Sequence, residues 1–71
     1  MKIVIIEYEL LTCRDLERTL KRADKSISVV TYLHSVSDAF VFFENQQHDY
    51  QLIFSDIELG DGKSFLIFDK F

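Results

Sequence analysis

The hydrophobic positions along the chain follow two alternating patterns, and each predicts one kind of element. Residues 3–6 form an uninterrupted run of isoleucine and valine, which is typical of a strand buried on both faces of a parallel sheet. Over residues 10–22 apolar side chains recur at helical spacing among charged ones, which predicts an amphipathic helix. Residues 27–33 are again rich in β-branched side chains and predict a second strand.

The alternation continues through the second half of the chain. A second helix is expected to begin at Ser35 or Ser37, because either hydroxyl can cap a helix. Its buried stripe would consist of Val36, Ala39, Phe40 and Phe43. A third strand is expected at about 51–55, and a last helix from about residue 63 or 64. The side chains of that helix expected to face the sheet are Phe65, Phe68 and either Leu66 or Ile67.

In the order βαβαβα, these elements predict an α/β fold of the flavodoxin-like kind, a doubly wound parallel sheet. Right-handed crossovers would place helices on both faces, and this fold type puts the first strand between the other two, in the order 2-1-3. The third strand is as apolar as the first, so it needs a neighbour on its far side. We therefore expect residues 1–71 to form one incomplete domain, the amino-terminal part of a larger sheet.

Composition narrows the classes of function. The chain has 8 Lys and Arg against 12 Asp and Glu, a formal net charge of −4, which disfavours direct contact with nucleic acid. Cys13 is the single cysteine, so no intramolecular disulfide can form and a cytoplasmic location is expected. The apolar run 3–6 is too short for a signal-peptide core, and no membrane span is expected. His34 and His48 are separated by a helix and lack a cysteine partner, which disfavours a zinc site.

Carboxylates follow two of the predicted strands at the point where each strand ends. Glu7 and Glu9, with Tyr8 between them, follow the first strand, and Asp56 follows the third. In an open parallel sheet the working crevice lies at the carboxyl ends of the strands, so these acids are candidates for one shared site. Mg²⁺ takes hard oxygen ligands, commonly one or two carboxylates, so Asp56 with Glu7 or Glu9 could hold it.

The residues 3–9, Ile-Val-Ile-Ile-Glu-Tyr-Glu, and 54–62, Phe-Ser-Asp-Ile-Glu-Leu-Gly-Asp-Gly, resemble the receiver domain of bacterial two-component response regulators. The resemblance is to the type fused to a LytTR DNA-binding domain, and it covers the first half of such a domain. It implies that Asp56 accepts a phosphoryl group from a histidine kinase. It further implies that Gly62 is the glycine that ends the loop after the acceptor strand.

The resemblance also implies a metal site. Glu7 and Tyr8 match the adjacent acidic pair that helps hold Mg²⁺, and Glu58 matches the position whose backbone carbonyl is a metal ligand. Tyr8 departs from the pattern, since a phenol with a pKa of about 10 is a poor Mg²⁺ ligand near neutral pH. The later strands, which carry a Ser or Thr and a Lys in this family, and the effector domain are expected to be absent from these residues.

The expected function is therefore a phosphoryl-accepting switch with a transcriptional output, and not an enzyme acting on metabolites. Its partners would be a histidine kinase and, through the third strand, a second copy of the chain; neither nucleic acid nor membrane is expected to contact this segment. The alternative is a degenerate receiver-like module that only binds other proteins. Tyr8 and the missing later strands favour that alternative, whereas the acids around Asp56 favour the switch.

Two enzymatic alternatives are disfavoured by position. Residues 62–64, Gly-Lys-Ser, match the end of a phosphate-binding P-loop, but Ile57 stands where that motif requires a glycine. Asp56 and Glu58 have the spacing of the acid pair of dehalogenase-type phosphatases. That family carries its nucleophile on the first strand of the fold and not on the third.

Overall fold

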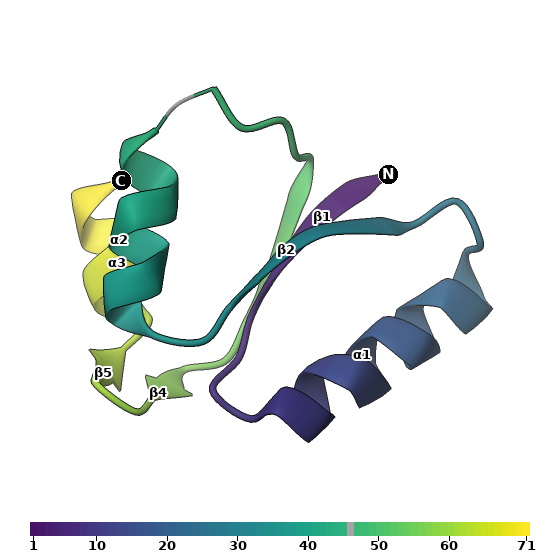
Figure 1. Ribbon diagram of the computed structural model, residues 1–71, viewed down its shortest axis with the longest axis horizontal. Coiled ribbons are helices and arrows are strands. Elements are labelled where there is room, and N and C mark those ends of the chain that lie inside the picture. Colours follow the sequence, from purple (N-terminus) through teal and green to yellow (C-terminus); the bar gives the residue numbers. More distant parts are fainter. Residues whose placement is uncertain (46) are drawn as a thin grey trace.

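In the computed structural model, which describes residues 1–45 and 47–71, strands and helices alternate along most of the chain (Figure 1). In chain order the elements are β1 (Lys2–Ile6), α1 (Leu10–Ala23), β2 (Ser28–Leu33), α2 (Val36–Glu44), β3 (Leu52–Ser55), β4 (Glu58–Leu59), β5 (Gly62–Lys63) and α3 (Phe65–Lys70). The predicted βαβαβα order is confirmed. The addition is a short antiparallel hairpin between β3 and α3.

The main sheet has three parallel strands in the order β2-β1-β3. This is the predicted order, with the most apolar strand at the centre. The β1–β3 pairing sets Ile6 opposite Ser55, and it continues past the strand ends, because the Asp56 amide donates to the Ile6 carbonyl at 2.8 Å. On the other side the Glu7 amide donates to the Leu33 carbonyl at 2.9 Å. Backbone pairing therefore fixes the residues that follow β1 and β3.

Helices cover both faces of the sheet, α1 on one and α2 with α3 on the other (Figure 1). The central strand accordingly has no exposed side chain between Ile3 and Ile6. Its residues alternate, as a strand requires: Val4 and Ile6 belong to the core cluster under α2 and α3, while Ile3 and Ile5 pack with Cys13 of α1. The uninterrupted apolar run of the sequence thus reflects burial on two faces.

The first two helices form as their patterns predict. In α1, Cys13 is buried, and Leu16 and Leu20 pack against the same cluster. In α2 the cap is Ser35, whose Oγ accepts a hydrogen bond from the Asp38 amide at 2.9 Å, which satisfies one of the donors that a helix start leaves unpaired. The predicted stripe is confirmed, since Val36, Ala39 and Phe43 are buried and Phe40 packs against them.

Helix α3 differs from the prediction in the face that it buries. Ile67 is fully buried, whereas Phe65 is 61% exposed and Leu66 and Phe68 are about half exposed. The helix has only six residues and follows the β4–β5 hairpin, which places it beside α2 (Figure 1). One side chain of so short a helix reaches the core. The expectation is confirmed for Ile67 and wrong for Phe65, whereas Phe68 is half exposed and lines a groove with Ile53 of β3.

The outer edge of β3 pairs with no other strand in the part of the chain that the structure describes. Within the same residues, no helix is long and apolar enough to cross a membrane.

Candidate functional site

Two carboxyl groups from distant parts of the chain meet at the carboxyl edge of the sheet. Glu7 follows β1 and Asp56 follows β3, so the pairing of these strands brings the two residues together. Glu7 is only 8% exposed, whereas Asp56 is open to solvent. A pocket of about 200 Å³ opens beside them, between α1 and β3, and both acids line it. The two carboxyl groups that the strand ends predict to lie together therefore do lie together.

The two carboxyl groups interact. Burial raises the pKa of Glu7 above its ordinary value, and the hydrogen bond and negative charge of Asp56 raise it further. A raised pKa means that the site disfavours a second negative charge. A pair of this kind can hold a proton between its oxygens, or it can hold a cation that replaces that proton.

The backbone of Glu7 is fixed by its neighbours on both sides. Its carbonyl accepts a hydrogen bond from His34 Nδ1 at 2.9 Å and one from Cys13 Sγ at 3.6 Å. His34 follows β2, and Cys13 lies on α1. Burial, with the charge of Glu7, also raises the pKa of the Cys13 thiol, so this buried thiol is a packing group and not a nucleophile.

The other acids predicted for the site take different positions. Glu9 lies at the start of α1 and is exposed, and its backbone hydrogen bond lowers the pKa of Glu7. The side chain of Glu58 is exposed and pairs with Lys63 across the β4–β5 hairpin, at 3.8 Å between Oε1 and Nζ. Only its backbone carbonyl is therefore a candidate ligand. Asp56 Oδ1 accepts a hydrogen bond from the Ile57 amide at 2.8 Å, so one of its oxygens is already engaged.

Tyr8 brings no carboxylate to the site and packs instead against the hairpin. Its side chain is 58% exposed, and its ring lies so close to Gly60 that a Cβ built at Gly60 would be 2.5 Å from Tyr8 Cε2. A glycine at this position allows the ring to lie against the backbone. The aromatic residue at a position where the resemblance implies an acid therefore has a packing role.

Sequence reasoning missed Asp61. This residue lies between the two glycines of the hairpin, and its carboxylate accepts hydrogen bonds from two amides at the start of α2. These bonds lower the pKa of Asp61. No periodic pattern connects residue 61 with residues 36 and 37, so the turn-forming glycines on either side of it are the only local signal.

The donor set around Asp56 suits Mg²⁺ in kind but is small. No cluster of three or more His, Cys, Asp or Glu side chains with metal-binding geometry occurs in residues 1–45 and 47–71. Mg²⁺ keeps several of its waters and is commonly held by one or two carboxylates. Glu7 and Asp56 supply that number, and their mutual repulsion is what a cation would relieve.

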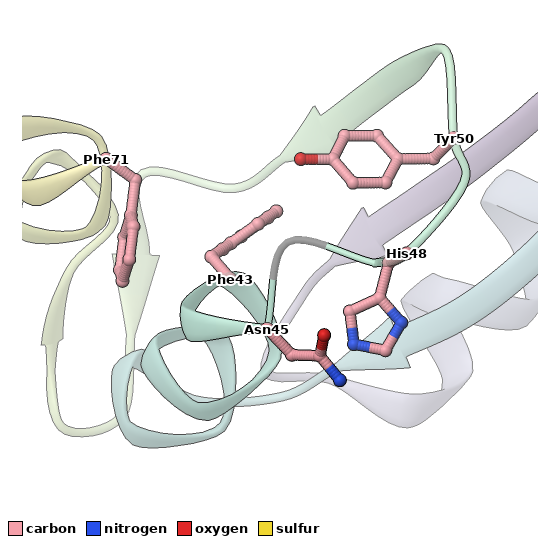
Figure 2. Close-up of a pocket in the computed structure, with 5 residues that line it drawn as sticks. All are labelled: Phe43, Asn45, His48, Tyr50 and Phe71. Carbon is pink, nitrogen blue, oxygen red and sulfur yellow. The ribbon is translucent and has the colours of Figure 1, made fainter.

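A pocket lined mainly by aromatic side chains lies away from the acids, beside the end of α2 and the start of β3 (Figure 2). Its volume is about 230 Å³, and its lining residues are Phe43, Asn45, His48, Tyr50 and Phe71. The His48 ring stacks on Phe42 with 3.9 Å between the ring centroids, so this histidine belongs to an aromatic cluster. The pocket contains no acid and is separate from the Glu7–Asp56 pair.

Comparisons of the chain with models of known protein families, with curated proteins and with solved structures gave no match. The functional interpretation therefore depends on the sheet, the acids at its edge and the motifs around them.

Proposed function

We propose that this chain is a phosphoryl-accepting receiver module of a two-component response regulator, with Asp56 as the acceptor. The observation that carries the proposal is the pairing of an exposed Asp56 with a buried Glu7 at the carboxyl edge of a 2-1-3 parallel sheet. Ligand sites of doubly wound sheets lie at this edge. In this proposal the three strands are the first part of a flavodoxin-like domain located in the cytoplasm.

The chemistry follows from the positions of the two acids. A free oxygen of Asp56 would attack the phosphorus of a phosphohistidine on the partner kinase, so that a P–O bond forms and the P–N bond breaks. Glu7 and the backbone carbonyl of Glu58 would hold Mg²⁺ together with Asp56. When bound, Mg²⁺ offsets the negative charge of the transferring phosphoryl group. Glu7 would remain in place because its backbone is bonded to β2 and α1.

A second candidate function, an interaction module that is never phosphorylated, has one specific observation in its favour. Tyr8 occupies a position that would otherwise supply a second acid, and its ring is already packed on Gly60. The site then has one carboxylate fewer to hold Mg²⁺. Both candidates share the same fold and differ only in whether Asp56 reacts.

Metal binding and phosphoryl transfer test the proposal together. We expect the unmodified chain to bind Mg²⁺ weakly and to react slowly with a small-molecule phosphodonor, because Tyr8 supplies no ligand. The Tyr8→Asp variant should bind Mg²⁺ more tightly, since it adds a hard oxygen ligand. The measurements are NMR titration of the Asp56 amide with Mg²⁺, and mass spectrometry after incubation with the phosphodonor.

Two further variants identify the acceptor. Asp56→Asn should abolish any phosphorylation, whereas Asp69→Asn, at an exposed acid on α3, should leave it unchanged. A phosphoryl group on the Asp56→Asn variant would refute the assignment of the acceptor. If Tyr8→Asp binds Mg²⁺ tightly and still takes no phosphoryl group, even from a histidine kinase, the interaction module becomes the better description.

A further inference from the structure

The β4–β5 hairpin is joined to the start of α2 by the side chain of Asp61. Asp61 Oδ1 accepts a hydrogen bond from the Val36 amide at 2.8 Å, and Oδ2 accepts one from the Ser37 amide at 3.1 Å. These amides lie in the first turn of α2, where backbone donors have no partner within the helix. A negative charge is also favoured there by the helix dipole. The two oxygens of this carboxylate thus join the hairpin to residues that lie 25 and 24 positions earlier in the chain.

Helix α2 has a cap of its own. Ser35 Oγ accepts the Asp38 amide at 2.9 Å, and this local bond begins the helix without any help from the hairpin. The two caps therefore serve different purposes. Removing Ser35 affects α2 alone, whereas removing Asp61 also releases the hairpin from α2.

The hairpin has a second support close to the acids. The ring of Tyr8 lies against Gly60, and Tyr8 directly follows Glu7 in the chain. Next to Gly60, Leu59 is buried in the core cluster that also contains Val36. Gly62 has φ +151°, a conformation that residues other than glycine rarely adopt, which restricts how the hairpin can leave this position. The hairpin is thus held on α2 at one point and against the site at another.

We propose that Asp61 is a positioning residue, which fixes the hairpin between α2 and the Glu7–Asp56 site and so couples the start of α2 to that site. The metal part of this proposal depends on the proposed function, because it concerns the Glu58 carbonyl as a ligand. The carbonyl belongs to the hairpin, so its orientation toward Asp56 depends on how the hairpin is held. A cation bound there would in turn be sensed by the Val36 and Ser37 amides.

The first test requires no metal. Backbone amide shifts are measured by NMR for Asp61→Ala and for Ser35→Ala, which both remove a cap from the same end of α2. Asp61→Ala should shift the amides of the hairpin and the ring signals of Tyr8. Ser35→Ala should shift only amides of α2. If the changes in Asp61→Ala are also confined to α2, Asp61 is merely a second cap and the proposal is wrong.

The second test adds Mg²⁺. In the unmodified chain the Val36 and Ser37 amides should shift during the titration, and this response should disappear in Asp61→Ala while it persists in Ser35→Ala. Loss of a supporting group behind a metal ligand commonly weakens affinity by about tenfold or more, so we expect roughly tenfold weaker binding in Asp61→Ala and unchanged binding in Ser35→Ala. A Val36 response that survives in Asp61→Ala would overturn the coupling.

The two proposals fail in different ways. If no amide of the unmodified chain responds to Mg²⁺, the metal site of the proposed function is refuted, and with it the coupling of a metal to α2. The positioning role of Asp61 is then still decided by the metal-free shifts.

Discussion

Glu7 is unusual among the acids of this chain because its environment opposes its charge. It is almost completely buried, and burial together with Asp56 raises its pKa. The Asp61 carboxyl is in the opposite situation, since the amides of α2 lower its pKa. The charged form is thus disfavoured at Glu7 and favoured at Asp61. The pH dependence of stability therefore tests the Glu7–Asp56 pair without any phosphorylation.

We expect Glu7→Gln to raise the free energy of unfolding at neutral pH. A carboxyl whose pKa is raised in the folded state contributes stability that is full below its ordinary pKa, 4.5, and is lost as the pH rises through the raised value. The gain from Glu7→Gln should therefore be largest near pH 7 and vanish below about pH 4. Urea unfolding at several pH values measures it.

The Asp56→Asn background provides the control for this measurement. Burial is the largest cause of the Glu7 shift, so Glu7→Gln should still be stabilising there, but by less than in the unmodified chain. Added Mg²⁺ should stabilise the unmodified chain and have little effect on Glu7→Gln. A Glu7→Gln variant that is less stable than the unmodified chain at pH 7 would show that the ionised carboxylate is already well compensated.

The site was predictable from the sequence only as far as it depends on strand ends. Glu7 and Asp56 each follow an apolar run, and parallel pairing brings such residues together without any further information. The contact of Tyr8 with Gly60 and the bonds of Asp61 to α2 join segments of irregular spacing. Their formation depends on where the hairpin packs, which no local pattern of hydrophobic residues specifies.

Among the elements, α1 is attached to the sheet by a polar contact as well as by its apolar stripe. The Tyr32 hydroxyl of β2 donates a hydrogen bond to Glu17 of α1, and Lys21 pairs with the same carboxylate at 3.1 Å. Burial, followed by the hydrogen bond to Glu17, raises the pKa of Tyr32 to about 12. The pKa of Glu17 is lowered, first by Tyr32 and then by Lys21. The contact therefore operates throughout the physiological pH range.

Tyr32→Phe should destabilise the chain by about 1 kcal/mol, the usual net contribution of one hydrogen bond. In a domain of this size that corresponds to a decrease in Tm of about 4–8 °C. Because the lowered pKa of Glu17 contributes stability that is lost as the pH falls through that pKa, the variant should also be less sensitive to acid. Thermal unfolding followed by circular dichroism tests both effects.

The matched control is Tyr50→Phe, because within the described residues the Tyr50 ring is in contact with Phe42 and Phe43 and its hydroxyl has no hydrogen bond. Its Tm should stay close to that of the unmodified chain. An equal decrease in Tm in the two variants would mean that the Tyr32–Glu17 hydrogen bond does not stabilise the chain.

The elements themselves were predicted with unequal success, for physical reasons. The three strands and the first two helices bury long, regular stripes, so the period of the apolar residues identifies them. The two-residue strands β4 and β5 are too short to show alternation, and their glycines indicate only a turn. For helix α3 the position in the chain was predicted correctly, but the buried face was not. That face depends on how the helix packs against the hairpin and α2, and its own pattern does not specify it.

At the scale of the molecule, the Glu7–Asp56 pair and the exposed apolar side chains lie in different regions. The acids lie at the carboxyl edge of the sheet, whereas Phe43, Tyr50, Phe68 and Phe71 line a groove of about 110 Å³ with Ile53 of β3. Six of the twelve exposed large hydrophobic residues lie between residues 52 and 71, so exposed apolar surface is concentrated around β3 and α3. This is also where an outer strand edge has no partner among the described residues.

An unpaired, uncharged strand edge is a template for pairing with another chain. We therefore expect self-association through β3 at micromolar concentrations, and a charge in that strand should suppress it. Leu52→Lys introduces such a charge at a side chain that is 42% exposed. Val30→Lys is the control, because Val30 is 41% exposed on β2 at the opposite edge of the sheet. Both variants change the net charge from −4 to −3, so a general effect of charge cannot separate them.

Sedimentation velocity over a range of concentrations should show dissociation in Leu52→Lys and unchanged association in Val30→Lys. If the unmodified chain sediments as a monomer with cooperative unfolding, or if both variants behave alike, pairing at the β3 edge does not occur.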